Sequence, residues 1–76
     1  MNTVRVYFNG RGVDVPDGAA AIEALAVFDA ALAAEVRSGQ RGLVDSRGLP
    51  ADPAHAVFGG AIYRVVSARA AAGGAA

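Results

Sequence analysis

The sequence predicts an α+β domain in which a mixed sheet of four to five strands packs on one main helix, in the order β-β-α-β-(β)-β. Two alternating segments joined by Asn-Gly, an Ala-rich helical segment and later β-branched runs support this prediction. A chain of 76 residues has room for one small hydrophobic core. We expect residues 1–68 to form the domain and residues 69–76 to form a flexible Ala/Gly tail.

The N-terminal segment predicts a β-hairpin. Residues 3–9 alternate between apolar and polar side chains, as expected of a half-buried strand. Asn9-Gly10 follows, and both positions tolerate the positive φ that a tight hairpin turn requires. Residues 11–15 alternate again, so the chain turns back along itself.

A helix is expected over residues 19–37, which contain no Pro and no Gly. Large apolar residues recur there at spacings of three and four and so form one helical face. Asp17 is expected to cap the N-terminus, and Gly39 is suited to the left-handed conformation after the C-terminus. Asp29 lies beside the apolar face and leaves two interpretations open. The helix either continues through Asp29 or breaks near Phe28, with Asp29 capping a second short helix.

Two or three short strands are expected in the second half of the chain. Leu43-Val44 forms the centre of one, and residues 45–48 have the composition of a turn. Leu49 begins at most a very short partner strand, because the Pro-containing stretch 50–56 disfavours regular structure. Residues 61–67 form the last strand. It can lie parallel to the first strand, because the helix provides the long crossover connection.

The predicted core combines the inward faces of these elements. Its members are Val4, Val6, Phe8, Val13, Val15, Ile22, Leu25, Phe28, Leu32, Leu43 and Val65. On the last strand Tyr63 shares a face with Val65, whereas Arg64 indicates that the opposite face is outward.

Composition excludes several classes of function. Seven basic and seven acidic residues cancel, which argues against a general binder of nucleic acid or anionic membranes. There is no Cys, and therefore no disulfide, thiolate metal site or cysteine nucleophile. No signal peptide and no run of about 20 apolar residues is visible, so a cytoplasmic location is expected.

Three segments carry a resemblance to a known family. Residues 4–10 read Val-Arg-Val-Tyr-Phe-Asn-Gly, residues 13–18 read Val-Asp-Val-Pro-Asp-Gly, and residues 59–66 read Gly-Gly-Ala-Ile-Tyr-Arg-Val-Val. Over residues 3–67 the chain resembles the β-grasp, ubiquitin-like superfamily. Within it, the chain is most similar to the small bacterial sulfur carriers of thiamine and molybdopterin biosynthesis (ThiS/MoaD-like).

The resemblance implies chemistry at the C-terminus. In the family a terminal Gly-Gly carboxylate is adenylated by a ubiquitin-activating-type enzyme and then converted to a thiocarboxylate or joined to an amine. Here the matching pair is Gly73-Gly74, but Ala75-Ala76 follows. A carrier function would therefore also require a peptidase that trims the tail. The alternative is a non-catalytic β-grasp interaction module with an inert tail.

Other polar residues are interpreted without a catalytic role, a metal site or a cofactor. His55 stands in a loop near Asp52 without a recognisable nucleophile. Four acidic residues are interpreted as turn and cap residues and not as metal ligands, because they show no recurring metal-ligand spacing. They are Asp14, Asp17, Asp45 and Asp52. The outward side chains Arg5, Tyr7 and Arg64 form either a solvated sheet face or a partner-docking patch.

Overall fold

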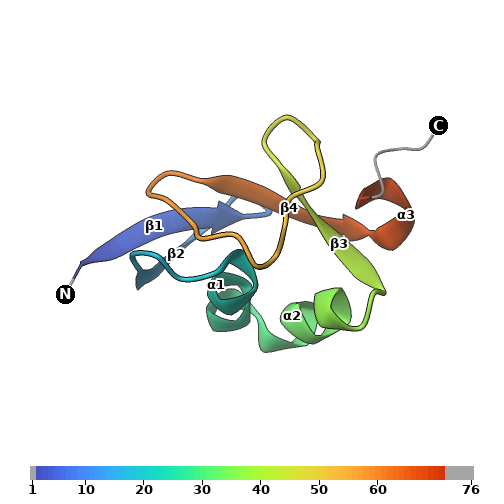
Figure 1. The fold of residues 1–76 in the computed structure, drawn as a ribbon, viewed down its shortest axis with the longest axis horizontal. Coiled ribbons are helices and arrows are strands. Elements are labelled where there is room, and N and C mark those ends of the chain that lie inside the picture. The colour runs from blue at the N-terminus through green and yellow to red at the C-terminus, as the bar shows by residue number, and fades with distance from the viewer. Residues whose placement is uncertain (1, 72–76) are drawn as a thin grey trace.

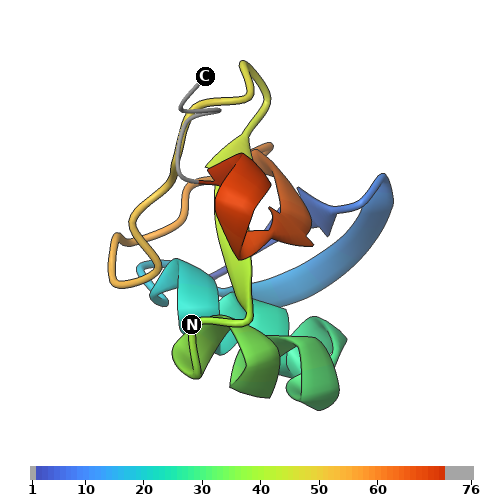
Figure 2. The same ribbon diagram turned by 90° about the vertical axis from the view of Figure 1, so that its right-hand side faces the viewer.

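The computed structural model describes residues 2–71 and contains a four-stranded mixed sheet with two main helices on one of its faces (Figures 1 and 2). In chain order the elements are β1 (Thr3–Phe8), β2 (Arg11–Pro16), α1 (Ala21–Phe28), α2 (Ala30–Arg37), β3 (Arg41–Asp45), β4 (Ile62–Ser67) and α3 (Ala68–Ala71). The strand order is β2-β1-β4-β3. The central pair is parallel and both outer pairs are antiparallel.

The predicted N-terminal hairpin is confirmed. β1 pairs with β2 in a register that places Val6 opposite Val13 and Phe8 opposite Arg11. Asn9 and Gly10 form the turn with φ of 54° and 82°, the left-handed conformations that this dipeptide tolerates. The Asn9 Oδ1 also accepts a hydrogen bond from the Val65 N–H at 3.0 Å, which ties the turn to β4.

Of the two interpretations of the helical segment, the broken helix is correct. α1 ends at Phe28, and Asp29 is extended, with φ −160° and ψ 103°. Its Oδ1 accepts hydrogen bonds from the N–H groups of Ala31 at 3.0 Å and Leu32 at 3.2 Å. Asp29 is thus the N-cap of α2, and its preference for local hydrogen bonding ends one helix and begins the next.

The prediction that Asp17 caps the first helix is wrong. α1 begins at Ala21, two residues later than expected, and Asp17 lies in the turn that precedes it. The N–H groups of Ala21 and Ile22 instead donate to the carbonyl oxygens of His55 and Pro53, both at 2.8 Å. A distant loop therefore satisfies the exposed donors at the start of α1.

β4 lies between β1 and β3. Its position beside β1 and parallel to it is the one expected from the helical crossover. Its parallel contact with β1 places Tyr7 opposite Ile62 and Phe8 opposite Tyr63. The optional fifth strand near Leu49 is absent from the described residues, where Pro50 makes only an isolated bridge to β3. Residues 46–61 consequently form one long connection between β3 and β4.

The core lies between the sheet and the two main helices. Of the predicted members, Val6, Phe8, Val15, Leu25 and Leu43 are buried, and Val4, Val13, Ile22, Phe28, Leu32 and Val65 are partly buried against them. The Phe8 ring lies 5.6 Å from the Phe28 ring and 5.4 Å from the Tyr63 ring, centroid to centroid. The connection adds Val57 and Ala61, which the sequence prediction did not include.

β4 runs directly into α3, a single helical turn beside β3 (Figure 1). Residues 69–71, predicted to begin a tail without regular structure, are therefore helical. Their Ala-rich sequence has the highest intrinsic helix propensity, which accounts for the difference. The remainder of the predicted tail, including Gly73 and Gly74, lies outside the described residues.

Candidate functional site

The three residues predicted as a docking surface lie on the sheet face opposite the main helices. Arg5 and Tyr7 lie two residues apart on β1 and so point to the same face of the sheet. Tyr7 pairs with Ile62, and Arg64, two residues further along β4, therefore lies on this face as well. Arg64 and Ile62 are exposed, whereas Tyr7 is half-buried. Tyr7 and the half-exposed Ile62 thus form the apolar part of this face.

Arg5 forms an ion pair with a residue on the neighbouring strand. Its Nε and Nη2 donate to the two carboxylate oxygens of Asp14 on β2, at 3.0 Å and 3.3 Å. The hydrogen bonds and the charge of Asp14 hold the pKa of Arg5 above its ordinary value. Gly12 makes room for this arrangement, because a Cβ there would lie 3.2 Å from both the Arg5 and the Tyr7 side chains.

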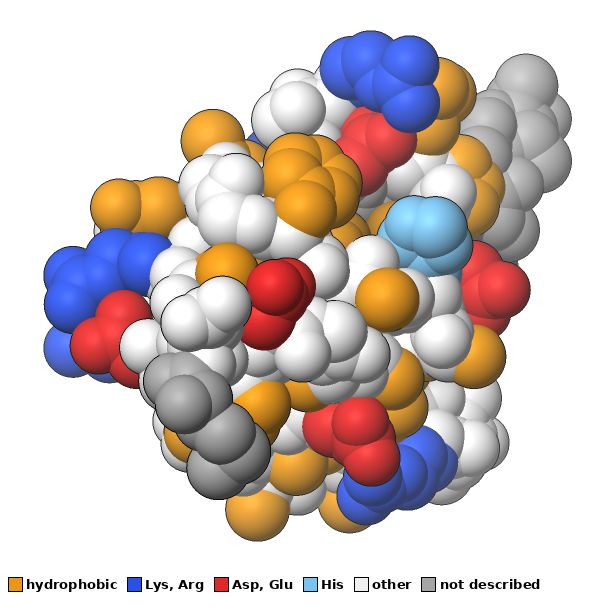
Figure 3. Space-filling model, turned by 60° about the vertical axis from the view of Figure 1, so that its left-hand side comes forward, with side chains coloured by type: hydrophobic (Ala, Val, Ile, Leu, Met, Phe, Trp, Pro, Cys, Tyr) orange, Lys and Arg blue, Asp and Glu red, His pale blue; other side chains and the backbone are white. Residues whose placement is uncertain are grey.

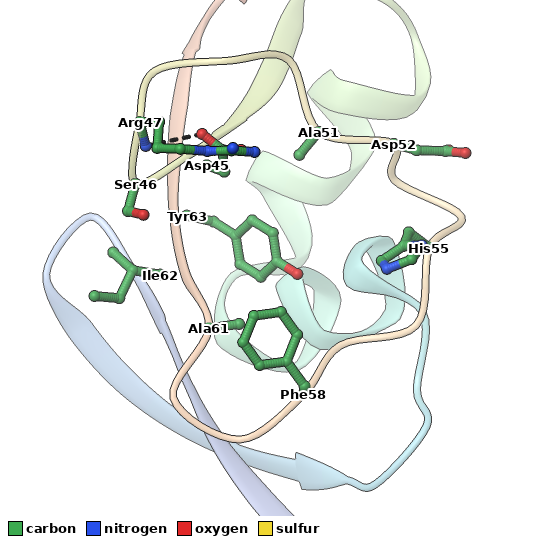
Figure 4. A pocket seen from close by; sticks show the side chains of 10 residues that line it. All are labelled: Asp45, Ser46, Arg47, Ala51, Asp52, His55, Phe58, Ala61, Ile62 and Tyr63. Atoms are coloured by element: carbon green, nitrogen blue, oxygen red, sulfur yellow. Dashed lines mark hydrogen bonds and ion pairs between the residues drawn. The ribbon is translucent and has the colours of Figure 1, made fainter.

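A second candidate site is a cavity of about 390 Å³ between β4 and the 46–61 connection (Figure 4). Its lining includes the Tyr63 side chain from the core face of the sheet and the His55 and Phe58 side chains from the connection. In Figure 4 the Tyr63 hydroxyl and the His55 imidazole point toward one another, and the Phe58 ring stands beside the Tyr63 ring. Aromatic surfaces and hydrogen-bonding groups therefore meet at one opening.

One edge of the cavity is the turn after β3, which Asp45 organises. Asp45 Oδ1 accepts hydrogen bonds from the N–H groups of Arg47 at 2.8 Å and Leu49 at 3.1 Å, and Oδ2 pairs with Arg47 Nη2 at 3.0 Å. These contacts, led by the Arg47 side chain, lower the pKa of Asp45. Gly48, with φ +80°, completes the turn in a conformation that side chains disfavour.

Tyr63 forms the inner wall of the cavity. It is only 6% exposed, and its ring stacks on Phe8 at an interplanar angle of 20°. Burial, and to a smaller extent the negative charge of Asp45, raise the pKa of its hydroxyl. The hydroxyl therefore stays protonated at neutral pH and can both donate and accept a hydrogen bond.

The surface around the cavity carries mixed charges. Figure 3 shows acidic, basic and hydrophobic side chains interspersed on this side of the molecule, with the histidine in pale blue at the surface. Among residues 2–71, no cluster of three or more metal-ligating side chains is present. No helix in the same range is long and apolar enough to span a bilayer.

Comparisons with known proteins assign no role to either site. No family model, no curated protein and no solved structure matches the chain.

The structure separates the residues that the sequence singled out. Arg5, Tyr7 and Arg64 share one sheet face, while His55, Asp45 and Asp52 line the cavity on the other side of β4. Asp52 Oδ1 accepts the Ala54 N–H at 2.9 Å, and its carboxylate points outward in Figure 4. Asp17 belongs to neither site.

Sequence reasoning missed the cavity. It treated residues 50–61 as a connection, although Phe58 is 62% exposed and stands next to a buried Val57. The signal available was the adjacency of two large apolar residues and a histidine within a segment predicted to be irregular.

Proposed function

We propose that this chain is a ubiquitin-like protein of the sulfur-carrier type. In this proposal a peptidase removes Ala75-Ala76, and an adenylating enzyme of the ubiquitin-activating type then activates the carboxylate of Gly74. Two glycines suit this chemistry because they leave no side chain to obstruct a narrow cleft.

The observation that supports the proposal is the sheet order β2-β1-β4-β3, with a parallel central pair and both main helices on one face. This arrangement is compatible with a small β-grasp-like fold, to which the sequence resemblance also points. β4 is a central strand, and the residues after it lead toward Gly73-Gly74. A firmly held strand next to the reactive segment suits a protein that presents its C-terminus to an enzyme.

The conformation of α3 determines how far the C-terminal segment can extend from β4. Four residues span about 6 Å as a helix but roughly 13 Å when extended. In the proposed function residues 68–71 unwind when the C-terminus enters the enzyme. Helix-breaking changes in α3 should then leave activation intact.

The direct test is the intact mass of the protein purified from its native host. The proposal requires a species that ends at Gly74, as a free acid, a thiocarboxylate or a conjugate. If every molecule retains Ala75-Ala76, the proposed function is wrong.

A substitution pair sharpens this test. Gly74→Leu should leave the circular dichroism spectrum unchanged and abolish all activated forms, because a branched side chain cannot enter the cleft. Ala76→Leu is the matched control, since the same side chain lies beyond the proposed cleavage point. Activated forms at wild-type abundance in Gly74→Leu would contradict the proposal.

A second candidate function is a non-catalytic interaction module. It is favoured by the sheet face that carries Tyr7, Ile62 and Arg64, where Ile62 is 50% exposed. In this case a chain lacking residues 70–76 should complement a deletion strain as well as the full chain does. Failure of the truncated chain to complement, while it remains folded, would exclude the module and favour the carrier.

A further inference from the structure

The 46–61 connection is held in place although it contains no helix or strand. Its carbonyl groups at Pro53 and His55 cap α1, and the Val57 N–H donates to the Ala19 carbonyl at 2.8 Å. Val57 is only 4% exposed and belongs to the core. The outer wall of the cavity is therefore anchored on both sides of His55, which fixes the position of that residue relative to the sheet.

The cavity offers two aromatic walls. Tyr63 cannot move far, because its ring packs on Phe8 in the core. Phe58 stands beside it at the opening with 62% of its surface exposed, so its ring is accessible to a ligand. A planar ring placed in the cavity would cover the exposed face of Phe58 and gain stacking contacts with it, while the small exposed part of Tyr63 borders the ligand.

Hydrogen-bonding groups are placed at the edge of that space. The Tyr63 hydroxyl and the His55 imidazole point toward each other across the opening (Figure 4). Each of these groups can donate or accept a hydrogen bond. They are suited to a ring whose edge carries both donors and acceptors.

Charge restricts the ligand further. The cavity is lined by Asp45, Asp52 and a single arginine, Arg47, whose side chain is held by Asp45. The carboxylate of Asp52 has no cationic partner among the described residues. The residues lining the cavity thus carry two carboxylates against one guanidinium, so they offer a negatively charged ligand no net attraction.

We infer that this cavity is a binding site for a small, uncharged, planar heteroaromatic molecule whose edge carries an amide or amine group. The ring packs on Phe58 next to Tyr63, and its polar edge bonds to the Tyr63 hydroxyl and the His55 imidazole. The volume of about 390 Å³ falls in the range of about 300–1,000 Å³ that is typical of small-molecule sites. This site is independent of any chemistry at the C-terminus.

Three probes of similar size separate the elements of this inference. Nicotinamide is planar and neutral, nicotinate has the same ring with a carboxylate, and cyclohexanecarboxamide has the amide without the planar ring. In a ¹H–¹⁵N NMR titration of the full chain, nicotinamide should shift the amide signals of residues 45–63 saturably. Nicotinate should bind more weakly, by up to about 5-fold, because the lining carries more negative than positive charge. Cyclohexanecarboxamide should also bind more weakly than nicotinamide, because it has no planar ring.

Two variants with a matched control complete the experiment. Phe58→Ala should weaken nicotinamide binding at least about 5-fold, the lower limit for loss of one aromatic stacking partner. Val27→Ala truncates a side chain that is equally exposed (63%) but lies on α1 outside the cavity, and should not change binding. Tyr63→Phe keeps the ring and should weaken binding about 2- to 10-fold through the lost hydroxyl. Absence of saturable shifts with nicotinamide, equal or tighter binding of nicotinate or cyclohexanecarboxamide, or equal effects of Phe58→Ala and Val27→Ala would overturn the inference.

Discussion

The β1–β2 hairpin and the 46–61 connection border the same core, but they are held in place by different interactions. The hairpin is organised by its own ladder of backbone pairs and by a two-residue turn. The connection depends on elements far away in the sequence. Its Gly60 N–H donates to the Arg5 carbonyl at 2.8 Å, and its Val57 N–H donates to the Ala19 carbonyl at 2.8 Å. A segment without regular structure can thus be as firmly positioned as a strand, provided that its neighbours supply the hydrogen bonds.

The largest loss of stability is expected from a change in the core that the hairpin and the connection both border. Leu25 on α1 is fully buried, and Leu25→Ala should cost about 2–5 kcal/mol of unfolding free energy. That cost is comparable to the whole stability of so small a domain, so the variant should be largely unfolded at room temperature. Circular dichroism during heating measures this, with Val27→Ala as the exposed control. A cooperative transition near that of the parent would contradict the central position of Leu25.

A smaller loss is expected from a change confined to the connection. Val57→Ala removes two methyl groups from a side chain that is 4% exposed and should cost about 1–2 kcal/mol. Urea denaturation should show a lower midpoint with an unchanged m-value, because the connection unfolds together with the sheet. An unchanged midpoint would show that the connection is not part of the cooperative unit.

The junction between the two helices tests local capping. Asp29→Ala removes the acceptor for the N–H groups of Ala31 and Leu32 and should cost about 1 kcal/mol. Asp17→Ala is the matched control and should be close to neutral, since Asp17 caps no helix in the structure. Equal losses of unfolding free energy for the two variants would contradict this assignment of the caps.

The smallest effect concerns pH at the turn that begins the connection. The pKa of Asp45 is lower in the folded state than its ordinary value of 3.8, so its contribution to stability is present above that pH. The contribution is lost as the pH falls below 3.8 through the folded-state pKa. Melting temperatures measured from pH 6 down to pH 2 should therefore fall more steeply for the parent chain than for Asp45→Asn. Parallel curves would show that the carboxylate contacts in this turn contribute nothing.

Much of the fold was predictable because it depends on local patterns. The alternation before and after Asn9-Gly10 defines the hairpin, and the spacing of large apolar residues defines the helical segment. Asp29 was recognised as a possible cap, but a single sequence did not decide between a continuous and a broken helix. The reason is that the apolar face continues past Asp29, so propensity and capping favour different outcomes.

The remaining features depend on contacts between distant residues. The cap of α1 comes from the carbonyl oxygens of Pro53 and His55, more than 30 residues later in the chain. The local sequence around Asp17 gives no sign that a distant loop supplies these hydrogen-bond acceptors. The cavity is unpredictable for the same reason, since Tyr63 and Phe58 become neighbours of His55 only when the connection packs on α1. The outward face of Arg5, Tyr7 and Arg64 follows from period-two alternation alone, and its role as a docking surface stays a prediction.

The parallel pairing of β1 with β4 has a consequence for the order of events during synthesis. β1 is made before the other elements of the sheet, yet its central neighbour is the last strand in the described part of the chain. The hairpin and α1 can form early, but their shared apolar surface stays uncovered until β4 has left the ribosome. Closing a loop of more than 50 residues then completes the sheet in one late step. A nascent chain that stalls before Ile62 would therefore expose the Phe8 edge of β1 to the solvent and to other chains.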